Sequence, residues 1–365
     1  MSDIGSANCR RCCTPLTRAV ACLIACFGIS LGAGSCGLNA EFEDTLQSEG
    51  SAFPGTAAAL GGPIVLAHGF GASKASVTTF FGVKDALERD GHFVVVTEVQ
   101  PFASVEARAG TLAPQLDRAI ADFCSARKFG VAACPRSTRV NIIAHSMGGL
   151  DARYAISRLG YGARVASLTT ISTPHHGSML ADAALGLLGS DRSFNEAGFN
   201  RLATAFGLAV TSAELAKNPD LRAGAEALTV AHSAAFNAAT ADDARVYYAS
   251  WAGVSKATGG WRFADEQRGV RAACGGHYEG RIAYADFMNP QLVLGASVVS
   301  SGATSLQDGL VTIESAKHGN FQGCIGADHL QEVGQPFLLA PDVWTGFDHV
   351  AFYRGIARDL GARGF

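Results

Sequence analysis

The sequence predicts an α/β fold in which helices cover both faces of a doubly wound, mostly parallel sheet. Two observations predict it. From Gly61 onward, apolar runs of strand length alternate with stretches whose apolar residues recur at helical spacing. The apolar runs, such as "GPIVLAHGF" and "FVVVTEV", have no polar face, which is typical of parallel strands buried on both sides. Right-handed crossovers between successive strands then build one open sheet.

Each segment has its own local signal. The strand segments are short, apolar and rich in β-branched residues, whereas the helical segments are longer and mix apolar with charged residues. We therefore expect strands at residues 62–70, 93–99, 139–145 and 164–173, and helices at residues 74–92, 105–127 and 146–159.

Polar residues lie at or just after the carboxyl ends of three of the expected strands. They are the pairs His68–Gly69 and His145–Ser146, and the stretch "TPHH" at residues 173–176. Active sites in open α/β sheets lie at the carboxyl ends of the strands. We therefore expect these polar residues to meet at one edge of the sheet and to form a site there.

Ser146 is the candidate nucleophile of that site. The stretch "RVNIIAHSMGGLDARY" reads as strand, sharp turn and helix, a setting that strains a serine and exposes its hydroxyl. The usual pattern is G-x-S-x-G, and Ala144 stands here at the first position. Alanine adds only one methyl group where strand and helix nearly touch, and Gly148 leaves room on the helix side. A glycine-rich turn with a capping serine is the alternative interpretation.

A nucleophilic serine needs a base, and the base needs an acid that orients it. After a turn of this kind the acid and then the histidine follow along the chain. His329 lies in a loop that opens a helix and suits a base, whereas His349 opens the terminal helical stretch and is expected to cap or pack there. Asp308, followed by glycine, is the candidate acid, although an Asp-Gly pair alone also reads as a plain turn.

The amino terminus predicts export. Three arginines precede a long apolar run that ends in small residues, which is the layout of a secretion signal. A buried helix is the alternative, but the run has no polar face. We assign residues 1–36 to this signal and residues 37–60, which are small, polar and aperiodic, to a flexible linker. Cleavage after Ser35 and lipidation of Cys36 in the lipoprotein-like "AGSC" both stay open.

The cysteines divide into two groups. Of ten, six lie at or before Cys36, and the other four form an even set that indicates two disulfides in an exported chain. Cys124–Cys134 would close a short loop between a helix and the next strand, and Cys274–Cys324 would tie two distant loops. A metal site is the alternative, but the cysteines after Cys36 lack the close spacing that it needs.

Composition bounds the remaining function classes. A chain of 365 residues that is 48% hydrophobic can bury a large core, as one α/β domain or at most two. The net charge is −3 and there is no basic run, so nucleic acid is not an expected partner.

From about Gly62 to its end, the chain resembles the secreted triacylglycerol lipases of Gram-negative bacteria, which are α/β-hydrolases that often need a dedicated foldase. The resemblance implies an α/β-hydrolase domain at residues 61–365, with Ser146 as nucleophile, Asp308 as orienting acid and His329 as base. It also implies a structural role for His349. The segments that carry the resemblance occur in family order: "PIVLAHGF", "VNIIAHSMGGLDARY", "LTTISTPHHGS", "NPDLRAGAEALT", "YYASWAG", "DGLVTIESAKHG" and "HLQEVGQ".

The resemblance and the chemistry together imply further site features. Cys274 and Cys324 are similar in position to the single disulfide of the family. The oxyanion is expected between the backbone N–H groups of Met147, just after the nucleophile, and Phe70, in the "HGF" loop. No redox or organic cofactor is required for this chemistry.

The family also implies a structural calcium ion, and here the match is incomplete. Asp286 matches the acidic position before the catalytic acid. The second acidic position, after the catalytic histidine, is the neutral Gln331, and Gln335 follows in the next turn. Calcium prefers several hard oxygen ligands with negative charge among them. The substitution therefore predicts a weak calcium site or none.

A helical insertion suggests the substrate class. "SMLADAALGLLGS" forms one apolar helical stripe, and helical sequence continues to about Ala239, which interrupts the strand–helix alternation. The pattern alone fits a buried core helix equally well. The resemblance implies a lid at about residues 179–240, which opens at a lipid surface. We therefore predict an esterase that acts on acylglycerols at an interface, with a lipase-specific foldase as an implied partner.

Several alternatives stay open. A short-chain esterase, a polyester depolymerase or an acyltransferase would use the same triad. A non-catalytic envelope lipoprotein with a binding role is the alternative from another class, and the complete set of triad residues and oxyanion loops argues against it. In each case we expect an exported chain, either secreted or anchored in the envelope.

Overall fold

The computed structural model describes most of the expected catalytic domain. The chain divides into two units, Met1–Gln47 and Ser48–Phe365, and every described residue belongs to the second. The expected signal, the linker before Leu60 and residues 189–220 of the expected lid lie outside the described residues. The structure describes residues 60–72, 79–126, 134–188, 221–256, 261, 263–282, 288–299, 306–334 and 345–365.

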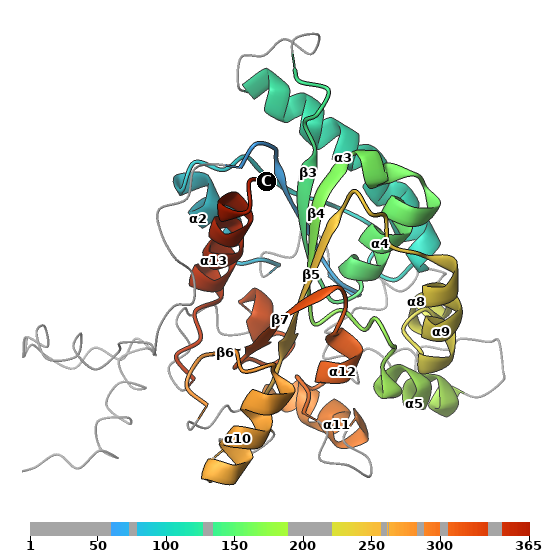
Figure 1. Cartoon of the computed structure of the whole chain (residues 1–365). Helices are drawn as coiled ribbons and strands as arrows, with labels where there is room; N and C mark the ends of the chain where they lie inside the picture. The colour runs from blue at the N-terminus through green and yellow to red at the C-terminus, as the bar shows by residue number, and fades with distance from the viewer. Residues whose placement is uncertain are drawn as a thin grey trace, which may run out of the picture. The chain divides into compact units, whose positions relative to one another are not determined.

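The described residues contain one parallel sheet, which confirms the predicted α/β fold. Its seven strands have the order β2-β1-β3-β4-β5-β7-β6 (Figure 1). The first four strands fall inside the four predicted segments, whereas the last three were not assigned from the sequence. The strands are β1 Ile64–Ala67, β2 Val94–Val96, β3 Val140–His145, β4 Val165–Ile171, β5 Tyr247–Gly253, β6 Tyr278–Glu279 and β7 Asn320–Ile325.

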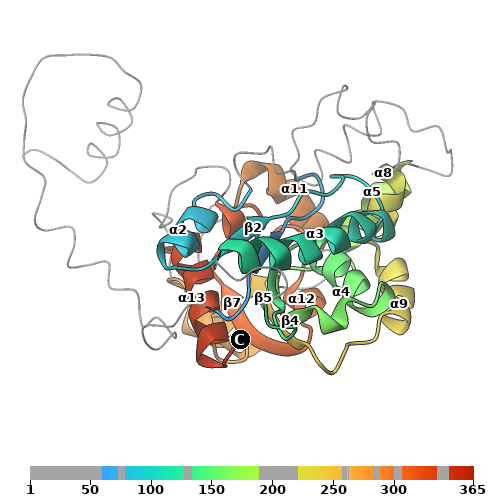
Figure 2. The same cartoon turned by 90° about the horizontal axis from the view of Figure 1, so that it is seen from above.

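Helices cover both faces of the sheet. Side chains alternate along each strand, so Ile64 and Leu66 of β1 face one way and Val65 and Ala67 face the other. The first pair packs in an apolar cluster with α2 and α13, and the second pair packs with α3 and α4 (Figures 1 and 2). The covering helices are α2 Val83–Arg89, α3 Val105–Ala126, α4 Gly148–Arg158 and α13 His349–Ala362.

Three predicted boundaries were too generous. The second strand is limited to Val94–Val96, since β2 is an edge strand that pairs only with Ile64–Leu66 of β1. The helix before it, as far as it is described, starts at Val83, after Gly82 in a left-handed conformation (φ 69°). The helix predicted to start at Ser146 begins two residues later, because the serine itself forms the turn.

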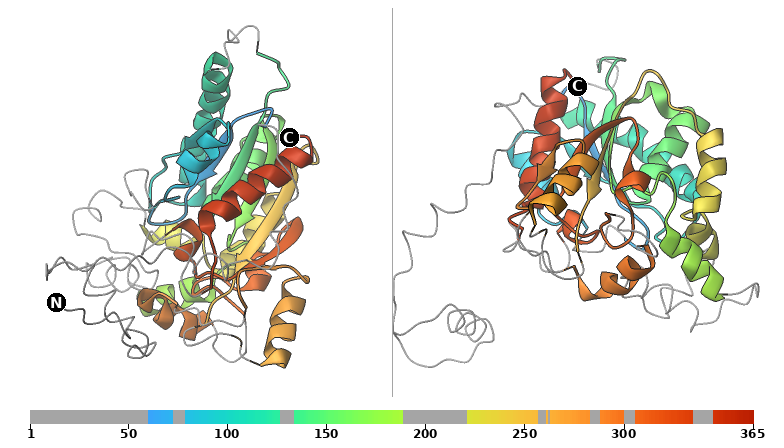
Figure 3. Two further views of the ribbon diagram at one scale, coloured as in Figure 1. Left: turned by 90° about the vertical axis from the view of Figure 1, so that its left-hand side faces the viewer. Right: turned by 60° about the horizontal axis from the view of Figure 1, so that its bottom comes forward.

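Another group of helices lies beyond the carboxyl ends of the strands (Figure 3). Apolar side chains of α5, α8, α9 and α11 form one cluster with Phe70 and Met147, the two residues expected at the oxyanion. This layer therefore covers the edge of the sheet where the polar residues gather. Its helices are α5 Met179–Leu188, α8 Leu221–Glu226, α9 Val230–Ala239 and α11 Pro290–Val299, with α10 Ala264–Ala273 and α12 Ile313–Ala316 nearby.

Both expected disulfides are present. Cys124–Cys134 joins the last turn of α3 to the segment before β3, and Cys274–Cys324 joins the end of α10 to β7. None of the helices in the described part of the chain is long and apolar enough to span a membrane.

The two disulfides should differ in their contribution to stability. Their sequence separations are 50 residues for Cys274–Cys324 and 10 for Cys124–Cys134. The chain-entropy model then gives losses of about 4 and about 3 kcal/mol in the free energy of unfolding when each pair is replaced by alanine. Denaturant unfolding of the two double variants measures both values. A larger loss from the shorter loop would contradict this ranking.

Candidate active site

Ser146 occupies a strained turn between β3 and α4. Its φ is 55°, in the left-handed region that non-glycine residues rarely adopt. Such strain costs roughly 1–3 kcal/mol and persists only where the surrounding structure imposes it. Two hydrogen bonds hold the turn: the Ser146 N–H donates to the Ile171 carbonyl at 2.9 Å, and the Thr173 hydroxyl donates to the Ser146 carbonyl at 2.7 Å. The serine is therefore presented by its backbone, as predicted for a nucleophile.

Small residues permit this turn. A Cβ atom at Gly148 would lie 2.5 Å from the Ala67 carbonyl oxygen, so α4 can start here only with glycine. A Cβ atom at Gly69 would lie 2.6 Å from the Ser146 Cβ, which places the "HGF" loop directly against the serine. Ala144 is fully buried in the apolar cluster under α3 and α4, and its methyl group is accommodated there. The departure from G-x-S-x-G therefore leaves the turn intact.

His329 and Asp308 form the pair that was expected. The Nδ1 of His329 lies 2.7 Å from Oδ2 of Asp308, and the His329 backbone N–H donates to the Asp308 carbonyl at 2.9 Å. Oδ1 of Asp308 accepts from the backbone N–H groups of Leu310 and Val311. Asp308 is fully buried and His329 is 4% exposed. These contacts hold the carboxylate in a fixed orientation toward the imidazole.

These contacts also set the charge of Asp308. Burial by itself would raise its pKa, but the facing His329 and the hydrogen bonds from His329, Leu310 and Val311 lower the pKa below its ordinary value. The carboxyl group is therefore ionised at neutral pH. An ionised acid on Nδ1 keeps that nitrogen protonated and leaves Nε2 as the basic atom.

The imidazole of His329 lies beside the serine turn. Its ring centroid is 4.5 Å from that of His145, the residue immediately before Ser146. Ser146 is 9% exposed. The structure therefore brings the three residues of the predicted triad to the same edge of the sheet. His349, by contrast, lies in the first turn of α13. Its Nε2 is 2.8 Å from the Phe81 carbonyl oxygen, in keeping with the packing role predicted for it.

Arg108 holds the "HGF" loop, and the sequence reasoning missed it. It is fully buried on α3, and its guanidinium donates to the carbonyls of His68 and Gly69 and to those of the facing 100–101 segment. Its Nε donates to Asp151 in the first turn of α4 at 2.8 Å. One side chain thus ties the "HGF" loop to the helix that follows the nucleophile. The sequence did contain a signal for this role, because Arg108 lies on the apolar face of the helix predicted at residues 105–127.

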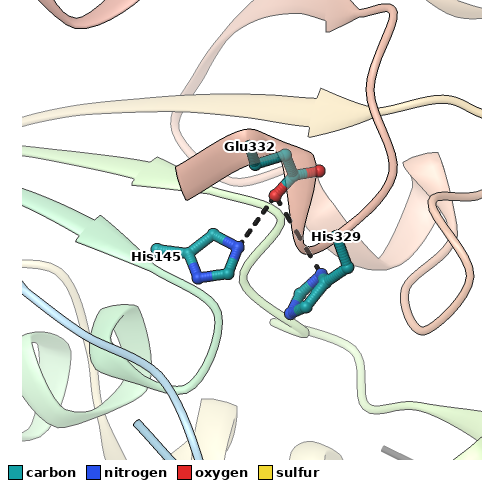
Figure 4. Close-up of side chains that lie close together, drawn as sticks. All are labelled: His145, His329 and Glu332. Carbon is teal, nitrogen blue, oxygen red and sulfur yellow. Dashed lines mark hydrogen bonds and ion pairs between the residues drawn. The ribbon is translucent and has the colours of Figure 1, made fainter. Parts of the chain in front are cut away.

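Glu332 is a second residue that was missed. It lies in the short 3-10 helix η2 Gln331–Val333, three residues after His329, and is fully buried. Its carboxyl group contacts His145 at 2.9 Å and approaches His329 to 4.0 Å (Figure 4). Burial and the nearby Asp308 raise the pKa of Glu332 well above its usual range. Asp308 and Glu332 are therefore buried carboxyl groups of one site, and their environments drive their pKa values apart.

At the expected calcium site, the one candidate ligand that the structure describes, Gln331, is hydrogen-bonded to the protein backbone. Asp286 and Gln335 lie outside the described residues. The side-chain oxygen of Gln331 accepts from the Asp328 backbone N–H at 2.8 Å. The fully buried Asp328 carboxylate in turn accepts from the Asn289 backbone N–H at 2.7 Å, which joins the segment before α11 to the His329 loop directly. Gln331 thus serves as a hydrogen-bond partner in a turn, which does not fit the role of a calcium ligand.

A second group of possible metal ligands is also better explained by hydrogen bonding than by a bound metal ion. Within the described residues, His145, His329 and Glu332 offer one atom each within 4.8 Å of one another. A metal ion on Nδ1 of His329 would take that nitrogen from Asp308, to which it is bonded at 2.7 Å. The observed pairing is the one that an acid–base histidine requires.

Comparisons with proteins of known sequence point to ester hydrolysis. The profile of the family described as "Palmitoyl protein thioesterase" matches residues 63–213. Triacylglycerol lipase 2 of Saccharomyces cerevisiae is 30% identical over 298 residues, which cover 78% of this chain and 74% of the yeast protein. The triacylglycerol lipase of Burkholderia plantarii is 31% identical over 179 residues, which cover 48% of this chain and 47% of that protein.

Solved structures show the same fold. A metagenomic carboxyl esterase, MGS0156, superposes with a TM-score of 0.56 at 19% identity, over 86% of this chain and 80% of that chain. The mature lipase BlEst2 of Bacillus licheniformis gives a TM-score of 0.52 at 18% identity, over 81% and 91% of the two chains. Both likenesses support the α/β-hydrolase fold.

Replacing Arg108 with lysine should impair turnover. Lysine keeps the positive charge but has too few donors, in the wrong geometry, to bind Asp151 and the loop carbonyls together. A displaced oxyanion loop should lower kcat by about 10²-fold, as the loss of an oxyanion donor does. The matched control is Arg118→Lys at an exposed position of the same helix. Equal kcat values for the two variants would show that Arg108 does not hold the loop.

Removal of divalent cations should change neither the activity nor the thermal stability of the enzyme. Gln331 is neutral, and its oxygen already accepts a backbone hydrogen bond. We expect the chelator EDTA to alter neither the rate of ester hydrolysis nor the thermal midpoint. A loss of either that added calcium restores, and magnesium does not, would show that a calcium site exists.

Proposed function

We propose that this chain, which belongs to the triacylglycerol lipase family and is a carboxylic ester hydrolase, cleaves acylglycerols through an acyl-enzyme on Ser146. The observation that supports the proposal best is the strained Ser146 turn beside the buried His329–Asp308 pair. A serine hydroxyl is a poor nucleophile at neutral pH, and this arrangement supplies the base and the orienting acid that it lacks.

In the proposed mechanism, Nε2 of His329 takes the proton of Ser146 as the hydroxyl attacks the ester carbonyl. Asp308, ionised because its pKa is lowered, stabilises the imidazolium that forms. His329 then donates its proton to the leaving alcohol, and the acyl group stays on Ser146. A water molecule, activated by the same imidazole, attacks the acyl-enzyme and releases the acid.

The oxyanion of each tetrahedral intermediate is proposed to lie between the backbone N–H groups of Phe70 and Met147. Met147 is the N-cap of α4, so the positive end of the helix dipole also faces the developing charge. Gly69 brings the other loop against the serine, and Arg108 holds that loop. These donors are oriented before substrate arrives, which is what makes such stabilisation effective.

A lipid substrate is supported by the layer of helices over the site. Leu180 of α5, Ala225 of α8 and Leu292 of α11 pack in one apolar cluster with Phe70 and Met147, and Ser146 is 9% exposed. A long acyl chain could reach the serine only if part of this layer moved. We propose that α5 and the helices after it, within residues 179–240, act as the lid and open at a lipid surface.

A cavity beside this layer offers space for an acyl chain. Its volume is about 360 Å³, and its apolar wall comes from Met179, Val230, Val299 and Leu310. Leu310 also donates its backbone N–H to the catalytic Asp308, so the wall of the cavity is continuous with the triad loop. We propose that this cavity receives part of the acyl group.

A thioesterase is the second candidate function. The profile match described as "Palmitoyl protein thioesterase" over residues 63–213 favours it, and a thioester would form the same acyl-enzyme. Comparing kcat/KM for an oxyester and a thioester of the same acyl chain separates the two candidates.

Export is part of the proposal. The chain carries an amino-terminal segment with the layout of a secretion signal, and its two disulfides fit an oxidising compartment. Mass measurement of the mature amino terminus distinguishes cleavage after Ser35 from lipidation at Cys36. Refolding of the mature chain on its own tests the implied foldase.

Replacing Ser146 with alanine should abolish ester hydrolysis and the reaction with an organophosphonate. The nucleophile is lost, while the backbone of the turn is kept. We expect one phosphonate adduct per chain in the wild type, located at Ser146 by mass spectrometry. Ser125→Ala, at an exposed position near the end of α3, is the control and should keep both. Undiminished turnover by the Ser146 variant would refute the mechanism.

Aggregated substrate should be hydrolysed faster than dissolved substrate. If α5 and its neighbours open at a lipid surface, the rate on a partly soluble ester should rise steeply once its concentration exceeds the solubility limit. Activity on a series of esters of increasing acyl length, measured below and above that limit, provides the test. Simple saturation without a break at the limit would show that the helical layer does not act as a lid.

A further inference from the structure

Glu332 joins the ends of two strands through its two carboxyl oxygens. Oε1 accepts from the Ser172 hydroxyl at 2.6 Å. Oε2 lies 2.9 Å from Nε2 of His145, a contact drawn in Figure 4. His145 is the last residue of β3, and Ser172 directly follows β4. All three side chains are buried, so these contacts are shielded from water. The carboxyl group therefore sits between neighbouring strand ends, next to the serine turn.

A third strand joins the same network. The Ser172 hydroxyl accepts from the backbone N–H of Gly253, the last residue of β5, at 2.9 Å. A Cβ atom at Gly253 would lie 1.9 Å from Oε1 of Glu332, so the glycine leaves the space that the carboxyl group fills. Ser172 has a φ of 46°, a strained conformation that the two hydrogen bonds of its hydroxyl help to maintain. We call Glu332, His145, Ser172 and Gly253 the Glu332 network.

The network reaches the triad through His145 and through a side-chain hydrogen bond between Glu332 and Asp308. The imidazole of His145 is hydrogen-bonded to the backbone of His329, and the two ring centroids are 4.5 Å apart. The carboxyl group itself stays 4.0 Å from Nδ1 of His329, which is bonded to Asp308 instead. Glu332 therefore does not replace Asp308 as the partner of His329. Glu332 instead contacts His145, which is hydrogen-bonded to the His329 backbone and directly precedes Ser146 in the chain.

The charges of these groups are compatible with a hydrogen-bond network. Burial, the negative charge of Asp308 and a hydrogen bond to Asp308 raise the pKa of Glu332 well above its usual range, and burial lowers the pKa of His145 well below its own. A neutral carboxyl group can donate to Nε2 of a neutral His145 while its other oxygen accepts from Ser172. A glutamine side chain has the same donor and acceptor at nearly the same positions.

We propose that Glu332 is a positioning residue, which holds His329 against the Ser146 turn by joining His145 and Ser172 at the ends of β3 and β4. The inference rests on the proposed function, since it assigns His329 and Ser146 their roles. It goes beyond the triad because Glu332 touches neither the substrate nor the reacting atoms. A loss of Glu332 should therefore act on turnover through the placement of the imidazole.

The test compares Glu332→Leu with Glu332→Gln in the full mature chain. A misplaced imidazole should lower kcat by about 10²-fold in the leucine variant, with an unchanged KM for a soluble ester. The glutamine variant should recover most of that loss, because it restores both hydrogen bonds. Glu88→Leu, at an exposed position of α2, controls for the loss of a carboxyl group elsewhere. Leucine and glutamine variants with the same kcat would overturn the proposal.

Ser172→Ala provides a milder second test, which also applies if the leucine variant does not fold. It removes both hydrogen bonds of the Ser172 hydroxyl, and the loss of the one to Glu332 should lower kcat about tenfold, the effect of roughly one hydrogen bond. Combined with Glu332→Leu, it should cause no further loss, because the two residues act as one unit. An unchanged kcat in Ser172→Ala would overturn the proposal. If Ser146→Ala stays active, the proposed function has failed; if only the Glu332 and Ser172 variants behave as wild type, this inference alone has failed.

Discussion

The close approach of α4 to the end of β1 is the constraint on which the site depends. The chain must leave β3, reverse direction and start a helix within two residues, and a side chain at Gly148 would collide with the Ala67 carbonyl. Because glycine at position 148 allows this close approach, Ser146 adopts its left-handed conformation and Gly69 passes directly against it. The strain at the serine is a consequence of this packing. The sheet, the helices on its faces and the buried Arg108 all hold the two backbones at that distance.

Asp308 and Glu332, both buried at this edge of the sheet, have different charges because their surroundings differ. Asp308 accepts backbone N–H groups and faces an imidazole, which together lower its pKa despite full burial. Glu332 has fewer stabilising donors and lies near the charge of Asp308, so its pKa is raised. One negative charge beside His329 is useful for stabilising an imidazolium, whereas two at this depth would repel each other. Environment rather than residue type therefore assigns their roles.

The helical layer over the carboxyl ends of the strands gives the site its apolar surroundings. Phe70 and Met147, whose backbone N–H groups are proposed to bind the oxyanion, contribute their side chains to the same cluster as α5, α8 and α11. The groups proposed to stabilise charge are thus anchored by apolar packing. Movement of the layer would change the exposure of the serine and the packing of the oxyanion loop together, which links access to catalysis in one structural element.

The sequence by itself determined what local patterns can express. Buried parallel strands carry continuous apolar runs, so β1 to β4 were predicted, and a serine between a strand and a glycine-rich helix indicated the turn at Ser146. Asp308 and His329 followed from chain order and from a family resemblance. The short strand β6 and the irregular β5 and β7 carry no such pattern. Only the tertiary structure brought His145 and Ser172 to Glu332, across 187 and 160 residues of chain, and Arg108 to the carbonyls of His68 and Gly69. Hydrogen bonds between residues so far apart depend on where the strands end in space, and no spacing along the chain records that.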